Sequence, residues 1–300
     1  PVEAKTDDYG REMSIIDVHT WAAKDRLVTG SYFISWTGGD GLDLAGGTSS
    51  GAGDVLRWAL RRTDIETEPG SLAALLPTLN AYQIDCVIQA SPDARVDLWE
   101  WLQAELLPLL PISAVRTAGR VVFVPWRWAA SSADAVAHLV EGANCERLGS
   151  VGYAARVEVR NEFRLSYAPD VRSGGFGKLA ILTGSQATLD SDSSAVPYGI
   201  CADSDRAYGT QVWEGSTSIV YDDATAQRIV RDLAHRYATQ PRHIGYTVAP
   251  DAAAHIDAGD VVSVTDPAIG LDGDLFFVTD KPRSSGEFFG VALREIRART

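Results

Sequence analysis

Hydrophobic positions recur at helical spacing between residues 216 and 241. The stripe advances by three or four residues at each step, which places all of its members on one face of a helix. Its members are Ala226, Ile229, Val230, Leu233, Ala234 and Tyr237. Asp222 or Asp223 can cap the first turn, because a short acidic side chain accepts a hydrogen bond from a free amide and suits the positive end of the helix dipole. The sequence therefore predicts an amphipathic helix over 223–239, which ends before Pro241.

The opposite face of this helix is polar. It carries Gln227, Arg228, Arg231, Asp232, His235 and Arg236. Asp232 stands four residues from Arg228 and four from Arg236, and such i,i+4 pairs contribute about 0.2–0.5 kcal/mol each to an isolated helix. This spacing is typical of a solvated face, so we expect no catalytic role for it.

Apolar residues after the helix alternate with polar ones. Ile244, Tyr246 and Val248 fall on one face of an extended segment, which is the period-two pattern of a strand with one buried face. The Gly-Asp pair at 259–260 then forms a corner, and a further strand is predicted over 261–264. A helix packed against a sheet is therefore expected for this part of the chain.

The chain before residue 216 divides by pattern into further regions. Between 54 and 145 the predicted elements are helices near 55–60, 71–79, 96–106 and 131–140, a strand over 84–88 and a hairpin over 114–124. Extended patterns recur at 151–155, 157–167 and 178–182. We therefore expect an N-terminal β segment over 1–53, an α/β subdomain over 54–145, and a β-rich domain over 146–300 that contains the packed helix.

The order of these motifs resembles the hub module of phage tail proteins. The run YDDATAQRIVRDLAHRYA, the strand after it and DAGDVVSVTD are similar to the end of that module, where a helix precedes a strand and a Gly-Asp corner opens the last strands of a small β-barrel. The segments VEVRNEFRLSYA and VPYGICADSDRAYGTQ resemble its long strands and its "S..yG" segment. The resemblance covers residue 151 to the C-terminus. It implies an α+β fold of small β-barrel hub domains, with the helical α/β subdomain as an insertion.

The resemblance also implies a function and a set of partners. Phage hub proteins are structural virion proteins of the tail tip or baseplate, and they join the tail tube to a central spike or fibre around the DNA exit channel. The implied partners are further copies of the chain in a homotrimeric ring, the tail tube or distal tail protein, and the spike or fibre protein. The implied location is the virion tail tip, after synthesis in the host bacterial cytoplasm.

The charge balance is acidic, with 40 Asp and Glu against 27 Lys and Arg and a formal net charge of −13. Proteins that bind nucleic acid neutralise phosphates with clustered basic residues, and no dense basic tract occurs here, so specific nucleic-acid binding is not expected. An acidic wall would let DNA pass through a channel without sticking to it. The candidate lining residues are Asp251, Asp257, Asp266, Asp272 and Asp274. An even spread of charge for solubility is the competing interpretation.

Residue types that carry catalysis or bind metals lack the necessary context. Cys86, Cys145 and Cys201 are far apart, so we expect buried free thiols and neither a disulfide, a zinc site nor an iron–sulfur cluster. No two of the five histidines have the H-x-x-x-H spacing of zinc hydrolases. Ser49 fits the pattern G-x-S-x-G, but its glycine-rich surroundings favour a loop over a nucleophile elbow. We therefore expect no catalytic residue, no cofactor, no metal and no enzyme activity.

Trp126 and Trp128 stand two residues apart after the predicted hairpin, so they share one face if the segment is extended. Such a pair can stack on sugar rings or anchor a partner chain, and it can equally pack against the core. Two other function classes therefore remain: a carbohydrate-binding or adhesion module of a tail, and a cell-wall hydrolase that uses Ser49 or an acidic pair. No apolar run approaches the roughly 18 residues needed to cross a bilayer, so membrane insertion is not expected.

Overall fold

The computed structural model describes residues 2–6, 12–16, 32–36, 51–84, 86–90, 97–117, 120–127, 129–153, 158–170, 174–184, 196–280 and 289–298. The chain divides into two compact units, one made of Pro1–Ser35 and Val87–Val96, the other of Trp36–Cys86 and Asp97–Thr300. In the N-terminal part, β1 (Val2–Thr6) pairs with β2 (Glu12–Ile16) in antiparallel register, and β3 (Tyr32–Trp36) pairs with β4 (Cys86–Ala90).

The segment from 52 to 125 contains short helices followed by a hairpin, as predicted. Helices α1 (Ala52–Leu60) and α2 (Pro69–Leu79) are followed by α3 (Leu98–Trp101), which continues into a π-helical turn over Leu102–Leu106 and a 3-10 turn over Leu107–Leu109. Asp97 caps α3, because its carboxylate accepts hydrogen bonds from the amides of Trp99 at 2.8 Å and Glu100 at 3.2 Å. The hairpin consists of β5 (Ile112–Thr117) and β6 (Arg120–Pro125).

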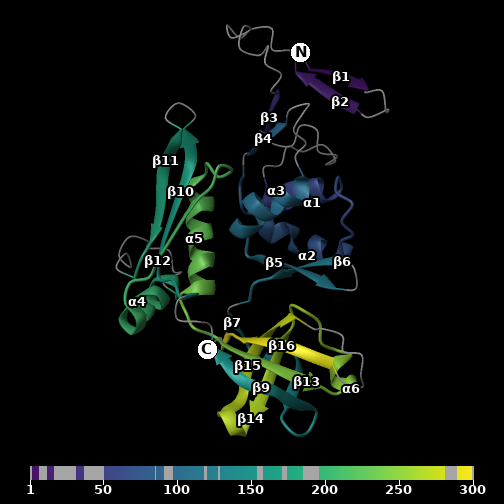
Figure 1. The fold of residues 1–300 in the computed structure, drawn as a ribbon, viewed down its shortest axis with the longest axis vertical. Coiled ribbons are helices and arrows are strands. Elements are labelled where there is room, and N and C mark those ends of the chain that lie inside the picture. Colours follow the sequence, from purple (N-terminus) through teal and green to yellow (C-terminus); the bar gives the residue numbers. More distant parts are fainter. Residues whose placement is uncertain are drawn as a thin grey trace. The chain divides into compact units, whose positions relative to one another are not determined.

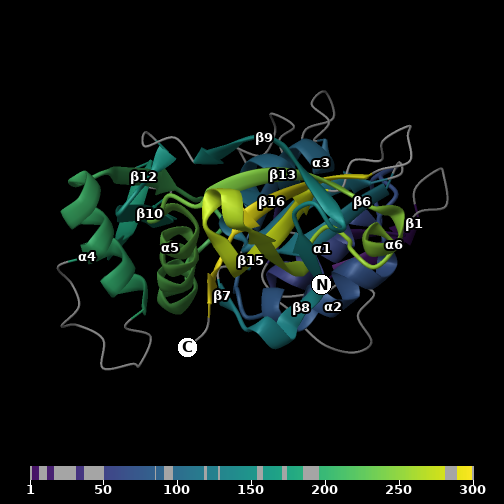
Figure 2. The same cartoon turned by 90° about the horizontal axis from the view of Figure 1, so that it is seen from below.

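A six-stranded sheet occupies the C-terminal part of the chain. Its strands are β8 (Ala135–Val140), β9 (Cys145–Tyr153), β13 (Arg242–Val248), β14 (Val261–Asp266), β15 (Leu271–Asp280) and β16 (Phe289–Glu295). Their order is β8-β14-β15-β16-β13-β9, and only β8 and β14 run parallel. Figure 2 labels β8, β9, β13, β15 and β16 of this sheet. Within the described residues, the edge strands β8 and β9 meet only at an isolated bridge between Glu141 and Cys145, so strand pairing does not close this sheet into a barrel.

A second, three-stranded sheet packs against the longest helix of the described residues. Strands β10 (Glu162–Asp170), β11 (Gly175–Leu182) and β12 (Val212–Ser216) form the order β11-β10-β12, and α5 (Asp223–Tyr237) lies along this sheet (Figure 1). Asp222 is the N-cap of α5: its carboxylate accepts a hydrogen bond from the Thr225 amide at 2.7 Å and another from the Thr225 hydroxyl at 2.8 Å. The helix predicted over 223–239 is thus confirmed, with an end two residues earlier.

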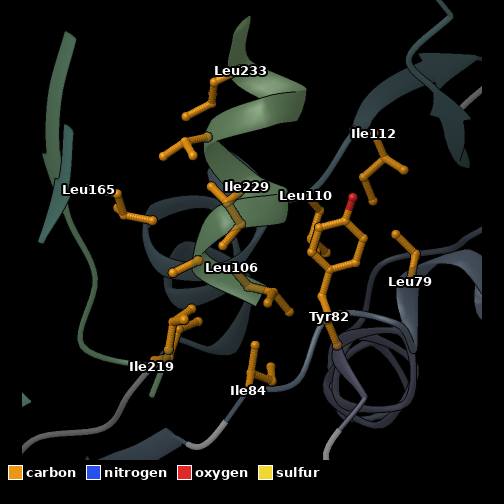
Figure 3. Packing of buried hydrophobic residues seen from close by; sticks show 14 of the residues in the cluster. Leu79, Tyr82, Ile84, Leu106, Leu110, Ile112, Leu165, Ile219, Ile229 and Leu233 are labelled. Atoms are coloured by element: carbon orange, nitrogen blue, oxygen red, sulfur yellow. The ribbon is translucent and has the colours of Figure 1, made fainter. Parts of the chain in front are cut away.

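Helix α5 is covered on two sides by apolar residues that lie far apart in the sequence. Ile229 and Leu233 point toward Leu165 of β10 on one side, and Leu106 and Tyr82 of the helical segment approach from the other (Figure 3). One continuous hydrophobic cluster therefore joins the helical segment to the three-stranded sheet. The predicted amphipathic stripe is buried as expected, because each of its apolar residues except Tyr237 is less than 9% exposed.

Two elements differ from the sequence prediction. The helix predicted over 131–140 is wrong: Ser131 and Asp134 form a capping box around a single 3-10 turn, Ser132–Asp134, and the chain then extends as β8. The pairing of β8 with β14 decides this conformation, because five residues of β8 are paired with β14 in a ladder of backbone hydrogen bonds. In addition, α4 (Val196–Tyr208) is a helix where the sequence analysis assigned none.

The Gly-Asp corner before β14 is confirmed and has a specific backbone requirement. Gly259 has φ +100°, which L-amino acids rarely adopt, and a Cβ atom added there would lie 2.8 Å from Cγ1 of Val124 in β6. Only glycine satisfies both the turn and this close approach of the β5–β6 hairpin. Val124 belongs to a separate apolar cluster with Val261, Leu275 and Phe277 on the six-stranded sheet.

Candidate assembly surface

Large hydrophobic side chains are exposed mainly along the edges of the two larger sheets. Of the seven such side chains in the described part of the chain, six belong to edge strands. These six are Val136 on β8, Leu148 and Tyr153 on β9, Phe176 and Leu179 on β11, and Val212 on β12. The seventh, Tyr221, precedes α5. We call the six residues the edge set.

An edge strand leaves a row of backbone N–H and C=O groups without a partner strand, and it can therefore pair with another chain. Soluble proteins often protect such edges with charged side chains. Here charged side chains on or beside the edge strands are engaged within the chain. These pairs are Lys178 with Asp223 at 2.6 Å, Glu214 with Arg164 at 3.1 Å, and Arg147 with Asp266 at 3.1 Å. The edges thus present apolar side chains next to neutralised charges, which is a composition that favours contact with another protein surface.

One face of the three-stranded sheet packs against α5, and the other face is not covered by this helix. Phe163 and Leu165 of β10 are fully buried toward α5, so Glu162 and Ser166 of the same strand face away from the helix. Leu179 lies opposite Ser166, and Val212 lies opposite Glu162. Both edge strands therefore contribute an exposed apolar side chain to the face that α5 does not cover.

The structure places Trp126 in an internal contact. Its indole nitrogen donates a hydrogen bond to the Ser113 hydroxyl at 3.0 Å, and the guanidinium of Arg236 lies 3.9 Å from the ring centroid. The side chain is partly buried against the central apolar cluster, so the ring face under Arg236 is not open to a sugar. Trp128 lies outside the described residues, and the predicted pairing of the two tryptophans stays a prediction.

Among the predicted channel-lining carboxylates, the structure separates Asp266 from the rest. Asp266 is fully buried, so its prediction as a residue lining the channel is wrong. Its carboxylate accepts hydrogen bonds from Arg147 at 3.1 Å, from the Tyr246 hydroxyl at 3.0 Å and from the Ala268 amide at 3.1 Å. Burial, followed by this hydrogen bond to Asp266, raises the pKa of Tyr246. Asp266 is therefore a structural carboxylate at the end of β14. One of its hydrogen-bond donors, the Ala268 amide, belongs to the turn that directly follows this strand.

The other four carboxylates differ in exposure. Asp251, Asp257 and Asp272 are exposed, whereas Asp274 is partly buried and forms an ion pair with Arg242 at 3.3 Å. Arg242 also contacts Glu295 at 2.6 Å, so Asp274 belongs to a network of three charged groups. Three of the five predicted residues are thus exposed, as a lining role requires.

A second buried carboxylate, Asp232, corrects the description of the polar face of α5. Asp232 is 8% exposed and accepts a hydrogen bond from the hydroxyl of Tyr82, 150 residues earlier in the chain. Burial raises the pKa of Asp232 to about 6 although the Tyr82 hydroxyl and Arg228 oppose this shift. Burial also raises the pKa of the Tyr82 hydroxyl. The i,i+4 spacing of polar residues on the helix does not reveal this hydrogen bond, because Tyr82 comes from a distant segment.

Among the residues that the structure describes, those considered for metal binding are not brought together, and the Cys86 side chain lies outside this description. Ser49 lies outside the described residues. Among the residues that the structure describes, no three His, Cys, Asp or Glu side chains are grouped as metal ligands. Cys145 and Cys201 are buried free thiols, and burial raises the pKa of each to about 12, which keeps them protonated and unreactive at neutral pH. None of the helices in the described part is long and apolar enough to span a membrane.

A scan against protein-family models found no match, and a search of curated proteins found none. Solved structures do resemble the fold. A virion of a native gene transfer agent particle is 18% identical over 82% of this chain and 47% of that chain, with a TM-score of 0.48. The 43 kDa tail protein of prophage MuSo2 from Shewanella oneidensis is 14% identical over 70% of this chain and 57% of that chain, with a TM-score of 0.37.

The prophage tail protein gp18 from Listeria monocytogenes EGD-e is 11% identical over 70% of this chain and 56% of that chain, with a TM-score of 0.37. The chain is similar to phage tail proteins. The chain spans about half the length of the solved structures to which it is similar.

Proposed function

We propose that this protein is a structural component of a phage-like tail, where it acts as a hub at the tail tip or baseplate and joins the tail tube to a central spike or fibre. Three motifs support the proposal in the order that the hub module requires: α5, then strand β13, then the Gly259 corner that opens β14. The solved structures reported above include a gene transfer agent virion and two prophage tail proteins, and the proposal assigns this chain to the same kind of particle.

The distribution of the edge set is the observation that carries this proposal. A hub must contact neighbours on several sides, and the exposed apolar side chains lie on four different edge strands in two sheets. An enzyme would instead collect its distinctive residues around one concave site. The edge set therefore favours an assembly protein over a catalyst.

The proposal includes a homotrimeric ring around a DNA exit channel. The unpaired edges β8 and β9 of the six-stranded sheet would then meet sheets of neighbouring copies, and the small barrel implied by the motifs would be completed in the assembly. Closed cyclic symmetry limits such association to a ring. The exposed carboxylates Asp251, Asp257 and Asp272 remain the proposed acidic lining.

The proposal also includes the absence of hydrolase activity. Hydrolase activity would be assayed in the full chain and in its Ser49→Ala variant, because Ser49 is the one serine in the G-x-S-x-G pattern. We expect the variant and the unchanged protein to behave alike on peptidoglycan and ester substrates. A hydrolytic activity that disappears in the variant would assign catalysis to this protein.

The location is tested by imaging particles that carry a peptide tag on this protein. Antibody labelling and electron microscopy should place the tag at the end of the tail distal to the head. A reconstruction of that tip should show three copies in a ring. Labelling of the head, or a tip with one or six copies, would contradict the hub or the trimer respectively.

A further inference from the structure

Two arginines meet at the C-terminal end of α5. Arg236 lies in the last turn of the helix, and its guanidinium stacks 3.9 Å from the centroid of the Trp126 ring. Arg294 of β16 donates a hydrogen bond from Nη2 to the backbone carbonyl oxygen of Arg236 at 2.5 Å. Both side chains are partly buried. The site is therefore built by three elements: the helix end, the segment after β6, and a strand of the six-stranded sheet.

Neither arginine has an acidic partner among the residues that the structure describes. In the described part of the chain, the other partly buried arginines of the sheets are each paired with carboxylates: Arg147 with Asp266, Arg164 with Glu162, and Arg242 with Glu295. No carboxylate of the described residues lies within ion-pair distance of Arg236 or Arg294. The pair thus stands apart in a chain with a net charge of −13.

Burial and mutual repulsion work against these two charges. Burial, and then the charge of Arg236, lower the pKa of Arg294 to about 10. Burial also lowers the pKa of Arg236. The negative end of the helix dipole and the face of the Trp126 ring offset part of this cost. One N–H of Arg294 has the Arg236 carbonyl as its acceptor, and the Arg236 side chain has a hydrogen bond with Tyr237. Each guanidinium group carries five N–H donors, so further donors can meet an incoming anion.

We propose that Arg236 and Arg294 form a binding site for an oxyanion, a carboxylate or phosphate group supplied from outside the chain. Guanidinium groups present planar pairs of N–H donors that match the oxygens of both groups, and an anion would neutralise two charges that repel each other. The site does not depend on the proposed tail function, because its chemistry rests on these residues alone.

His243 provides a reporter at the border of the site. It lies directly opposite Arg294 in the β13–β16 register and is exposed. Burial and then the charge of Arg294 lower the pKa of His243, whereas Glu158 raises it. An anion bound to Arg294 screens that positive charge, so it should raise the pKa of His243. The nuclear magnetic resonance signals of the His243 ring, assigned with His243→Gln, make this change measurable.

The test uses the full chain and inorganic phosphate at constant ionic strength, with chloride as the reference anion. Phosphate should raise the melting temperature and shift the His243 signals of the wild type. Arg236→Gln and Arg294→Gln should each weaken phosphate binding by about tenfold or more, because a hydrogen bond to a charged group is lost. Arg62→Gln is the matched control, since Arg62 also stacks on a tryptophan, 4.4 Å from the Trp58 ring, but is exposed.

A second arm distinguishes the source of the anion. A glutamate-rich peptide that binds more tightly than phosphate, with the same loss in Arg294→Gln, would assign the site to a carboxylate of another protein. Tighter binding of phosphate would assign it to a free anion. Arg294→Lys keeps a charge and a donor to the Arg236 carbonyl, so it should fold and bind with intermediate strength. Equal responses of wild-type protein to phosphate and chloride, or equal binding by Arg62→Gln and Arg294→Gln, would overturn the proposal.

Discussion

The interior and the edges of the six-stranded sheet place large apolar side chains in opposite surroundings. Phe276 and Tyr246 inside the sheet are fully buried, whereas Val136 and Leu148 on the edge strands are 49% and 54% exposed. Burial removes apolar surface from water and gains about 25 cal/mol per Å², so folding accounts for the interior residues. It does not account for the edge residues. We propose that contacts which the isolated chain does not make explain the exposed apolar side chains of the edges.

The largest expected effect on stability comes from replacing phenylalanine by alanine, which should have very different consequences inside the sheet and at an edge. Phe276→Ala should lower the free energy of unfolding by about 3–5 kcal/mol, because it leaves a cavity in a fully buried position. Phe176→Ala should change it by no more than about 0.5 kcal/mol, because this edge residue is already 43% exposed. Urea unfolding of both variants checks the comparison. Equal losses would show that the edge side chains serve the folded monomer and would remove the basis for an assembly role.

The buried carboxylate of Asp232 gives the next largest effect. Its pKa is raised by burial from 3.8 to about 6, so the folded state binds a proton more readily than the unfolded state between these values. This contribution to stability is therefore fully present below pH 4 and is lost as the pH rises through 6, on the order of 3 kcal/mol in total. Asp232→Asn should remove that pH dependence, measured as the difference in unfolding free energy between variant and wild type. A difference that stays constant from pH 4 to pH 7 would contradict the raised pKa.

A smaller effect distinguishes two glycines with left-handed backbone angles. Gly273 has φ +73° with open space around it, so Gly273→Ala should cost about 1 kcal/mol of backbone strain. Gly259→Ala should cost roughly 2–4 kcal/mol, because the new methyl group also meets Val124. In a protein that also carries Val124→Ala, Gly259→Ala should lower the free energy of unfolding by no more than Gly273→Ala does. Equal costs for the two glycine variants in the presence of Val124 would show that this contact is not tight.

Local patterns predicted the elements whose partners are near in sequence. The apolar stripe of α5, the cap of this helix and the turn at Gly259 could all be predicted from the sequence, because each depends on residues within a few positions. The β8 segment was misread as a helix, since its conformation is fixed by pairing with β14 about 125 residues later. Asp232 was misread for the same reason, because Tyr82 is 150 residues away. The edge set needs the strand order of both sheets, which no local pattern contains.

Assembly at the sheet edges is the central claim, and particle incorporation tests it most directly. The double variant Leu148→Glu, Leu179→Glu places a charge on β9 and on β11, where both leucines are more than half exposed. Ala254→Glu adds the same charge at an exposed position after α6 (Pro250–Ala253) and serves as the control. Each protein would be supplied to particles that lack the wild-type chain. The account predicts that the double variant keeps the wild-type free energy of unfolding within about 0.5 kcal/mol but is missing from purified particles, whereas Ala254→Glu is incorporated. Incorporation of the double variant at the wild-type level would contradict the claim.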